Sequence, residues 1–234
     1  FRLEANIPDT HPGYDGVRGY PSAGMGQQGG WANQIPDSGT WWDNIPARCD
    51  SITSAWAGYK GLNLAGTTCK GHAAHDMRFV TDPRQTGGST GIDPNSVIAM
   101  EWLVQIQHVG GYATHPGGKT PAWYRGAVTL DGVKWHMYLQ YGAQTVLFQW
   151  IPDRYPAPNW LNLRTMIRYM MTTRFSQLPN GAGSIIRRGA DANSFIVEGG
   201  HHFLSDVIGF EVCGPGALRM EVDSATLRVN KDPF

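Results

Sequence analysis

The stretch Ser205-Asp-Val-Ile-Gly-Phe-Glu-Val-Cys-Gly-Pro-Gly-Ala217 places the carboxylate of Glu211 where an apolar run gives way to a Gly/Pro-rich turn. After the turn, apolar side chains recur largely at every second residue, with one slip, at Met220, Val222, Ala225, Leu227 and Val229. A two-residue period indicates a β-strand, because successive side chains of a strand point to opposite faces. This part of the chain therefore predicts two strands joined by a turn, with one acid beside the turn.

The composition is that of a turn-rich β protein. The 234 residues include 30 Gly and 15 Pro, and only 16% are charged, a balance that favours short strands and many turns. We expect one domain over residues 1–234, with an irregular Gly/Pro-rich segment over residues 1–48 and an insertion loop over residues 173–194. A formal net charge of zero gives no reason to expect a nucleic acid as partner, and no apolar run is long enough to predict a membrane span.

The longest strand signal is Ser96-Val-Ile-Ala-Met-Glu-Trp-Leu-Val-Gln-Ile-Gln107. Regular alternation puts Ile98, Met100 and Trp102 on one face and Glu101 and Leu103 on the other. Glu101 would need a bulge or a one-residue slip to share the face of Met100 and Trp102.

A hairpin and a helix are also expected. Asp131-Gly132 is a strong tight-turn signal between strands over residues 122–130 and 133–141. Asn159 can cap the helix that follows it. The buried stripe expected on this helix consists of Leu163, Met166, Ile167 and Met170.

Three short motifs along the chain contain the candidate acids or the residues near them. Glu211 lies in Gly209-Phe-Glu-Val-Cys213, Asp76 in His75-Asp-Met77, and Trp102 in Met100-Glu-Trp-Leu103. They resemble the Gly-Thr-Glu-Pro-Phe, Tyr-Asp-Leu and Met-x-Trp-Leu motifs of the family 12 glycoside hydrolases, which are endoglucanases and xyloglucanases. Residues 132–142 and 146–151 look like two of the family's strands, and residues 160–170 like its single helix. The resemblance covers roughly residues 70–230.

The resemblance implies an all-β fold, a concanavalin-like β-jelly-roll sandwich of two sheets with one helix packed on the outside. It also implies that Glu211 is the general acid/base and that Asp76 is the acid beside the nucleophile. The family's nucleophile lies two residues before the matching Met, and that position is Ile98 here. The residues expected to line the site are Ile98, Met100, Trp102, Tyr112, His115 and Cys213.

The missing nucleophile leaves two main hypotheses, and it leaves open whether the chain is an enzyme. In the first, the protein acts on or binds a β-linked glucan, with Glu211 as acid/base and Glu101 as the replacement carboxylate. In the second, Ile98 belongs to an apolar pocket, where Glu211 and Asp76 assist an isomerisation, cyclisation or lyase-type step on a small hydrophobic molecule. A third reading is binding without catalysis.

Three cysteines bear on the location of the protein. We expect a disulfide between Cys49 and Cys69, worth about 3 kcal/mol in the chain-entropy model, with Cys213 left free. The chain begins at Phe1, which is consistent with a processed secreted protein and equally with an arbitrary start. No cofactor or metal is expected, since His72 and His75 would point to opposite faces of a strand.

Overall fold

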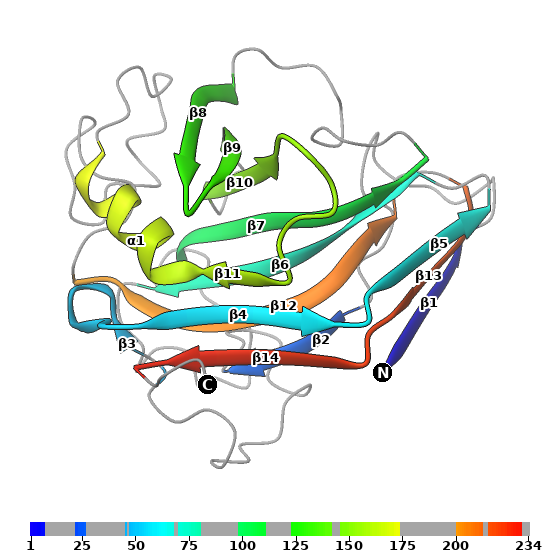
Figure 1. Ribbon diagram of the computed structural model, residues 1–234, viewed down its shortest axis with the longest axis horizontal. Coiled ribbons are helices and arrows are strands. Elements are labelled where there is room, and N and C mark those ends of the chain that lie inside the picture. The colour runs from blue at the N-terminus through cyan, green and yellow to red at the C-terminus, as the bar shows by residue number, and fades with distance from the viewer. Residues whose placement is uncertain are drawn as a thin grey trace.

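The computed structural model describes residues 1–7, 22–26, 45, 47–67, 70–80, 98–110, 123–141, 146–173, 200–212 and 215–230. These residues form almost only β-strands, together with one α-helix, α1 (Leu163–Thr172) (Figure 1). The strands are β1 (Arg2–Ile7), β2 (Ser22–Gly26), β3 (Ala47–Arg48), β4 (Ala55–Lys60), β5 (Asn63–Thr67), β6 (Gly71–Val80), β7 (Ile98–Val109), β8 (Tyr124–Leu130), β9 (Val133–Tyr141), β10 (Val146–Pro152), β11 (Trp160–Asn162), β12 (His202–Val212), β13 (Gly216–Glu221) and β14 (Ser224–Val229).

The strands form two layers. One layer is an eight-stranded sheet in the order β2-β12-β6-β7-β10-β9-β8, with β3 also paired to β12. The other consists of two three-stranded sheets, β1-β13-β5 and β11-β4-β14, which follow one another along the molecule in Figure 1. This arrangement confirms the predicted all-β sandwich with one helix.

The N-terminal segment is more regular than its composition predicts. Residues 2–7 form β1, which pairs with β13, and residues 22–26 form β2, which pairs with β12. The alternation of Leu3 and Ala5 with Arg2 and Glu4 is a strand pattern. The description of residues 1–48 as irregular is therefore wrong for these two strands and for β3. The predicted insertion over residues 173–194 lies outside the described residues apart from its first residue.

The core lies between the two layers and is rich in large aromatic side chains. Phe79, Trp102 and Trp150 are fully buried. The ring centroids of Phe79 and Trp102 are 4.5 Å apart, and those of Trp102 and Trp150 are 5.6 Å apart. Aromatic contacts of this kind add about 0.5–1.5 kcal/mol per pair to the free energy gained by burial.

The hairpin and the helix follow the sequence closely. Asp131 and Gly132 both have positive φ, 49° and 79°, as a two-residue turn between right-twisted strands requires. The expected stripe of α1 is buried, which confirms it. The N-cap of α1 differs from the prediction: it is Asn162, whose side-chain oxygen accepts a hydrogen bond from the Thr165 backbone N–H at 3.3 Å. Asn159 cannot cap α1 because β11 pairs with β4 first and delays the helix start.

Cys49 is a free, buried thiol, so the predicted bridge to Cys69 is wrong. The Cys49 backbone N–H donates to the carbonyl of His201, at the end of the sheet where β6 reaches Val80. Lys70, which follows Cys69 in the sequence, precedes the opposite end of β6, and ten strand residues span roughly 30 Å. A disulfide needs Cα atoms within about 7 Å.

Within the described part of the chain, no helix is long and apolar enough to cross a membrane.

Candidate active site

Three acidic side chains lie on one face of the eight-stranded sheet. Asp76 is on β6, and β6 lies between β12, which carries Glu211, and β7, which carries Glu101. Arg78, two residues after Asp76 and therefore on the same face, pairs directly with Glu101 across the sheet. The long antiparallel pairings of β6 thus bring together acids that are far apart in the sequence.

The structure corrects the expected site on β7: the strand face that carries Glu101 faces the other acids, and the face of Met100 and Trp102 does not. Met100 and Trp102 are fully buried in the core, and the Trp102 indole N–H donates to Met100 Sδ at 2.6 Å. They cannot line a site shared with Glu101, because adjacent strand residues point to opposite faces. The residues expected beside the sugar are therefore core residues, and Glu101 belongs to the acidic group.

A register shift lies at the start of β7, before Met100. The pairing of β6 with β7 is irregular between Phe79 and Val80: Phe79 pairs with Met100, whereas Val80 pairs with Ile98. One extra residue, Ala99, is accommodated on β7 as in a β-bulge. The simple alternation used for residues 96–107 therefore fails at this point. The side chain of Ile98 lies outside the described structure.

Two basic residues accompany the acids. Arg78 Nη2 donates to Asp76 Oδ2 and to Glu101 Oε1, both at 3.4 Å. His72, which pairs with Glu211 in the sheet, has its Nε2 3.2 Å from Glu211 Oε2. A strand period counted from Asp76 would have found both residues, since His72, Ala74, Asp76 and Arg78 alternate along β6.

Burial and mutual repulsion keep two of the acids protonated at unusually high pH. The pKa of Asp76 is raised well above its usual value, first by burial and then by the charge of Glu101, although Arg78 opposes the shift. Burial, with a further contribution from Glu101, raises the pKa of Glu211 from 4.5 to about 8. A protonated carboxyl beside other carboxylates is the arrangement that supports general acid catalysis near neutral pH.

Hydrogen-bonded amides extend this face away from the acids. The Gln105 side-chain N–H donates to Gln149 Oε1 at 3.3 Å, and the Tyr155 hydroxyl donates to Gln105 Oε1 at 2.6 Å. Both glutamines are buried. The sequence interpretation missed these polar residues, because Gln105 and Gln149 lie within strands that read as apolar.

The remaining expected site residues are not placed by the structure. Tyr112, His115 and Cys213 lie outside the described residues. Among the residues that are described, no group of three or more His, Cys, Asp or Glu side chains is arranged to hold a metal ion.

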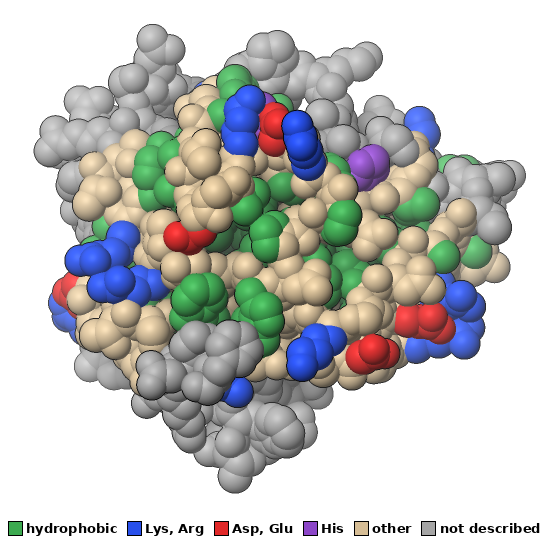
Figure 2. Space-filling view, in the orientation of Figure 1, with side chains coloured by type: hydrophobic (Ala, Val, Ile, Leu, Met, Phe, Trp, Pro, Cys, Tyr) green, Lys and Arg blue, Asp and Glu red, His purple; other side chains and the backbone are tan. Residues whose placement is uncertain are grey.

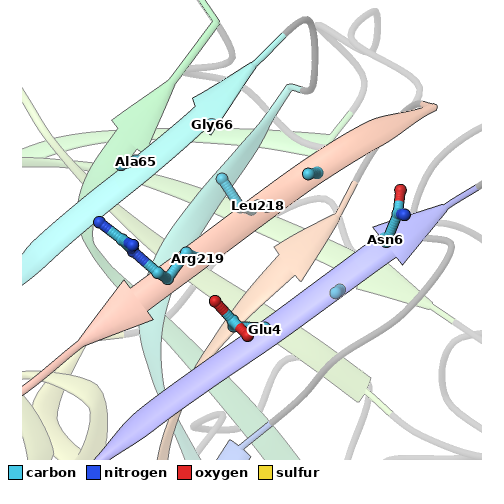
Figure 3. A pocket seen from close by; sticks show the side chains of 8 residues that line it. Glu4, Asn6, Ala65, Gly66, Leu218 and Arg219 are labelled. Atoms are coloured by element: carbon cyan, nitrogen blue, oxygen red, sulfur yellow. The ribbon is translucent and has the colours of Figure 1, made fainter.

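A separate groove lies on the other layer. It has a volume of about 660 Å³ and crosses β1, β13 and β5, where Glu4, Asn6 and Arg219 surround a floor of small residues (Figure 3). None of the three acids of the eight-stranded sheet lines it. The groove is therefore distinct from the acidic group.

Comparisons with known proteins identify the fold. No family model matches the sequence, and no curated protein matches it. Solved structures do: a family 12 xyloglucanase from Bacillus licheniformis superposes with a TM-score of 0.64 at 15% identity, over 96% of this chain and 79% of that one. The endoglucanase Cel12A from Rhodothermus marinus gives 0.58 at 16% identity over 96% and 79%. The family 12 endoglucanase 3 from Trichoderma harzianum gives 0.57 at 14% over 92% and 72%.

These likenesses span almost the whole chain although few residues are identical. Their extent agrees with the order of motifs seen in the sequence and with the two layers of strands. The chain has the β-jelly-roll fold of the family 12 glycoside hydrolases.

Proposed function

We propose that the protein hydrolyses a β-linked glucan, with Glu211 as the general acid and Glu101 as the second carboxylate. The observation that carries the proposal is the convergence of Glu211, Asp76 and Glu101 on one face, where burial raises the pKa of Glu211 to about 8. Glu211 then holds the proton that a departing sugar oxygen needs at neutral pH. Glu101 supplies the carboxylate that is missing at Ile98.

The strand register argues against the closely spaced carboxyl groups of a retaining pair, so we expect an inverting course. Glu211 pairs with His72 and Glu101 with Arg78, so the two glutamates are offset along β6, and Asp76 lies between their partners. Inverting glycosidases hold their carboxyl groups about 6.5–9.5 Å apart, which leaves room for a water, whereas retaining ones need about 5–5.5 Å. In this scheme Glu101 removes a proton from the water that attacks the sugar, and Glu211 protonates the leaving oxygen.

The surroundings of the acids support a hydroxyl-rich ligand. Gln105 and Gln149, buried and hydrogen-bonded to each other and to Tyr155, make this face polar rather than apolar, which suits a sugar better than the small apolar molecule of the second hypothesis. On the face drawn in Figure 2, charged side chains lie in small separate groups, and neither sign forms an extended patch. An uncharged polymer fits such a surface. We place its hydrolysis outside the cell, where a polymer is accessible.

Hydrolysis is tested by reducing-sugar release from β-1,4-glucan, xyloglucan and mixed-linkage glucan. Glu211→Gln and Glu101→Gln are each expected to abolish release. Glu221→Gln, which changes a half-exposed acid on β13, serves as the matched control and is expected to behave as wild type. NMR of the first product should show inversion at the anomeric carbon. No release from any of the three glucans would overturn the proposal, and a product of retained configuration would overturn the inverting course.

A further inference from the structure

Two tyrosines and a histidine form a cluster at the β8 edge of the eight-stranded sheet. Tyr124 on β8 pairs directly with Tyr138 on β9, and their ring centroids are 5.2 Å apart. The ring of His136 lies 6.0 Å from that of Tyr124. Tyr124 is 39% exposed, whereas most large hydrophobic side chains of the described structure are covered. We name Tyr124, Tyr138 and His136 the tyrosine platform.

A chain of polar contacts holds the platform in place. His136 Nε2 lies 2.9 Å from Asp153 Oδ1, and Lys134 Nζ lies 3.3 Å from the same oxygen. When His136 Nε2–H donates to Asp153, its Nδ1 accepts the hydroxyl of Tyr124, 3.2 Å away. The hydroxyl is thereby tied back toward β9, and the ring has a fixed orientation. A preorganised aromatic ring loses little conformational entropy when a ligand packs on it.

The platform lies on the same face as the acids. Direct cross-strand pairs share a face, and they run without a break from Tyr124 to Tyr138, Gln149, Leu103 and Asp76. This row crosses β8, β9, β10, β7 and β6. Four strand spacings amount to roughly 19 Å measured along the sheet. Leu103 and Gln149, in the middle of the row, are only 2% and 1% exposed, so a ligand with one bond at the acids reaches the platform by passing above the side chains that cover them.

We propose that the tyrosine platform is a distal binding site for one sugar ring of a β-linked glycan whose scissile bond lies at the acids. This inference rests on the proposed function for the identity of the ligand. The face of an aromatic ring packs against the apolar C–H face of a pyranose, and the sugar hydroxyls remain free to hydrogen-bond. Asp153 and Lys134, both about half exposed at the rim of the platform, offer such partners.

A distal site predicts an effect that depends on the length of the substrate. The platform contacts sugar far from the reacting bond, so it stabilises the bound ground state and the transition state equally. Loss of such uniform binding raises KM and leaves kcat unchanged. Oligosaccharides too short to reach from the acids to β8 lack the contact in any case. Tyr124→Ala is expected to raise KM for a long soluble β-glucan roughly three- to tenfold, and to leave kcat/KM for short aryl oligosaccharides unchanged.

The experiment compares wild type, Tyr124→Ala, Tyr124→Phe and the control Phe1→Ala, which removes an exposed aromatic on the other layer. Steady-state kinetics are measured on the long glucan and on short aryl oligosaccharides. Retardation in native gels containing the same glucan provides a second readout that needs no hydrolysis. Tyr124→Phe keeps the ring and should retain most of the affinity, and Phe1→Ala should match wild type.

The outcomes separate this inference from the proposed function. An unchanged KM for the long glucan in Tyr124→Ala, or an equal loss on long and short substrates, overturns the platform as a distal site while hydrolysis stands. If wild type releases no sugar, the hydrolase proposal fails. Gel retardation that Tyr124→Ala alone weakens still supports the platform as a glycan site in that case. Absence of retardation in every variant, together with absence of hydrolysis, overturns both.

Discussion

Replacing Glu211 with Gln is expected to stabilise the folded protein at alkaline pH while abolishing hydrolysis. The Glu211 side chain is only 13% exposed, and burial together with the charge of Glu101 raises its pKa from 4.5 to about 8. Between these two pH values the folded protein holds a proton that the unfolded chain has released. Gln has the same shape and no charge to bury.

The sign and size follow from linkage. Because the folded state binds more protons than the unfolded state in this window, the free energy of unfolding falls as pH rises from 4.5 to 8. The fall is at most about 1.4 kcal/mol per pH unit, which sets an upper limit of about 5 kcal/mol over the window. His72, 3.2 Å away, and the partial exposure of Glu211 reduce this cost. We expect Glu211→Gln to exceed wild type by about 2–4 kcal/mol above pH 8.

Urea unfolding of both proteins between pH 4.5 and 8.5 measures the difference. The two free energies of unfolding should agree near pH 4.5 and diverge steadily as pH rises. Glu221→Gln, at an exposed acid of β13, should show no such divergence. A variant that is less stable than wild type at pH 8, or a gap that does not change with pH, would refute the reasoning, since ionised Glu211 would then be well accommodated.

Three other predictions concern the arginine beside the acids, the packing of β4 and the buried thiol. Arg78→Met removes the guanidinium shared by Asp76 and Glu101 and should lower kcat about 10²-fold with an altered pH–rate profile. Arg78→Lys should recover part of the rate. An unaltered pH–rate profile in Arg78→Met would contradict a positioning role for Arg78. Gly58→Ala should lower the free energy of unfolding by about 1–3 kcal/mol in thermal or urea denaturation, because the new Cβ would lie 2.5 Å from Trp160 Cε3. Gly200→Ala is the control, since a Cβ added there meets no atom within 4 Å. Equal stability of the two variants would contradict the clash. Burial raises the pKa of Cys49 to about 12, so its thiol should not react in the native protein. Cys49→Ala should therefore leave the number of reactive thiols unchanged in the native protein and lower it by one after unfolding. Fewer reactive thiols in the native variant would show that Cys49 is accessible.

The acids show how far sequence reasoning reached. Glu211 and Asp76 were identifiable, because each lies in a short motif whose order along the chain matched a known fold. Glu101 was harder to assign, since its place beside Arg78 depends on how β7 pairs with β6. Nothing local in residues 96–107 marks that register or shows which face of the strand turns toward the other acids. Both are decided only when β7 pairs with β6 and packs against the opposite layer.

The errors have the same origin. Met100 and Trp102 were expected at the site, and the structure packs both in the core, because the choice of which strand face turns inward is made by the opposite layer. The Cys49–Cys69 bridge looked plausible from spacing in the sequence. It fails because Cys49 is a free thiol at the Val80 end of β6, whereas the chain enters β6 from the Cys69 side at its other end.

The sequence by itself determined the elements that depend on neighbouring residues. The two-residue period set the strands, Asp131-Gly132 set the hairpin turn, and the helical period set the buried stripe of α1. Only the tertiary structure decided which faces meet, where the register slips, and how burial and neighbouring charge raise the pKa of Glu211. Local patterns act through adjacent dihedral angles, whereas register, burial and the repulsion between carboxylates exist only after distant strands have paired.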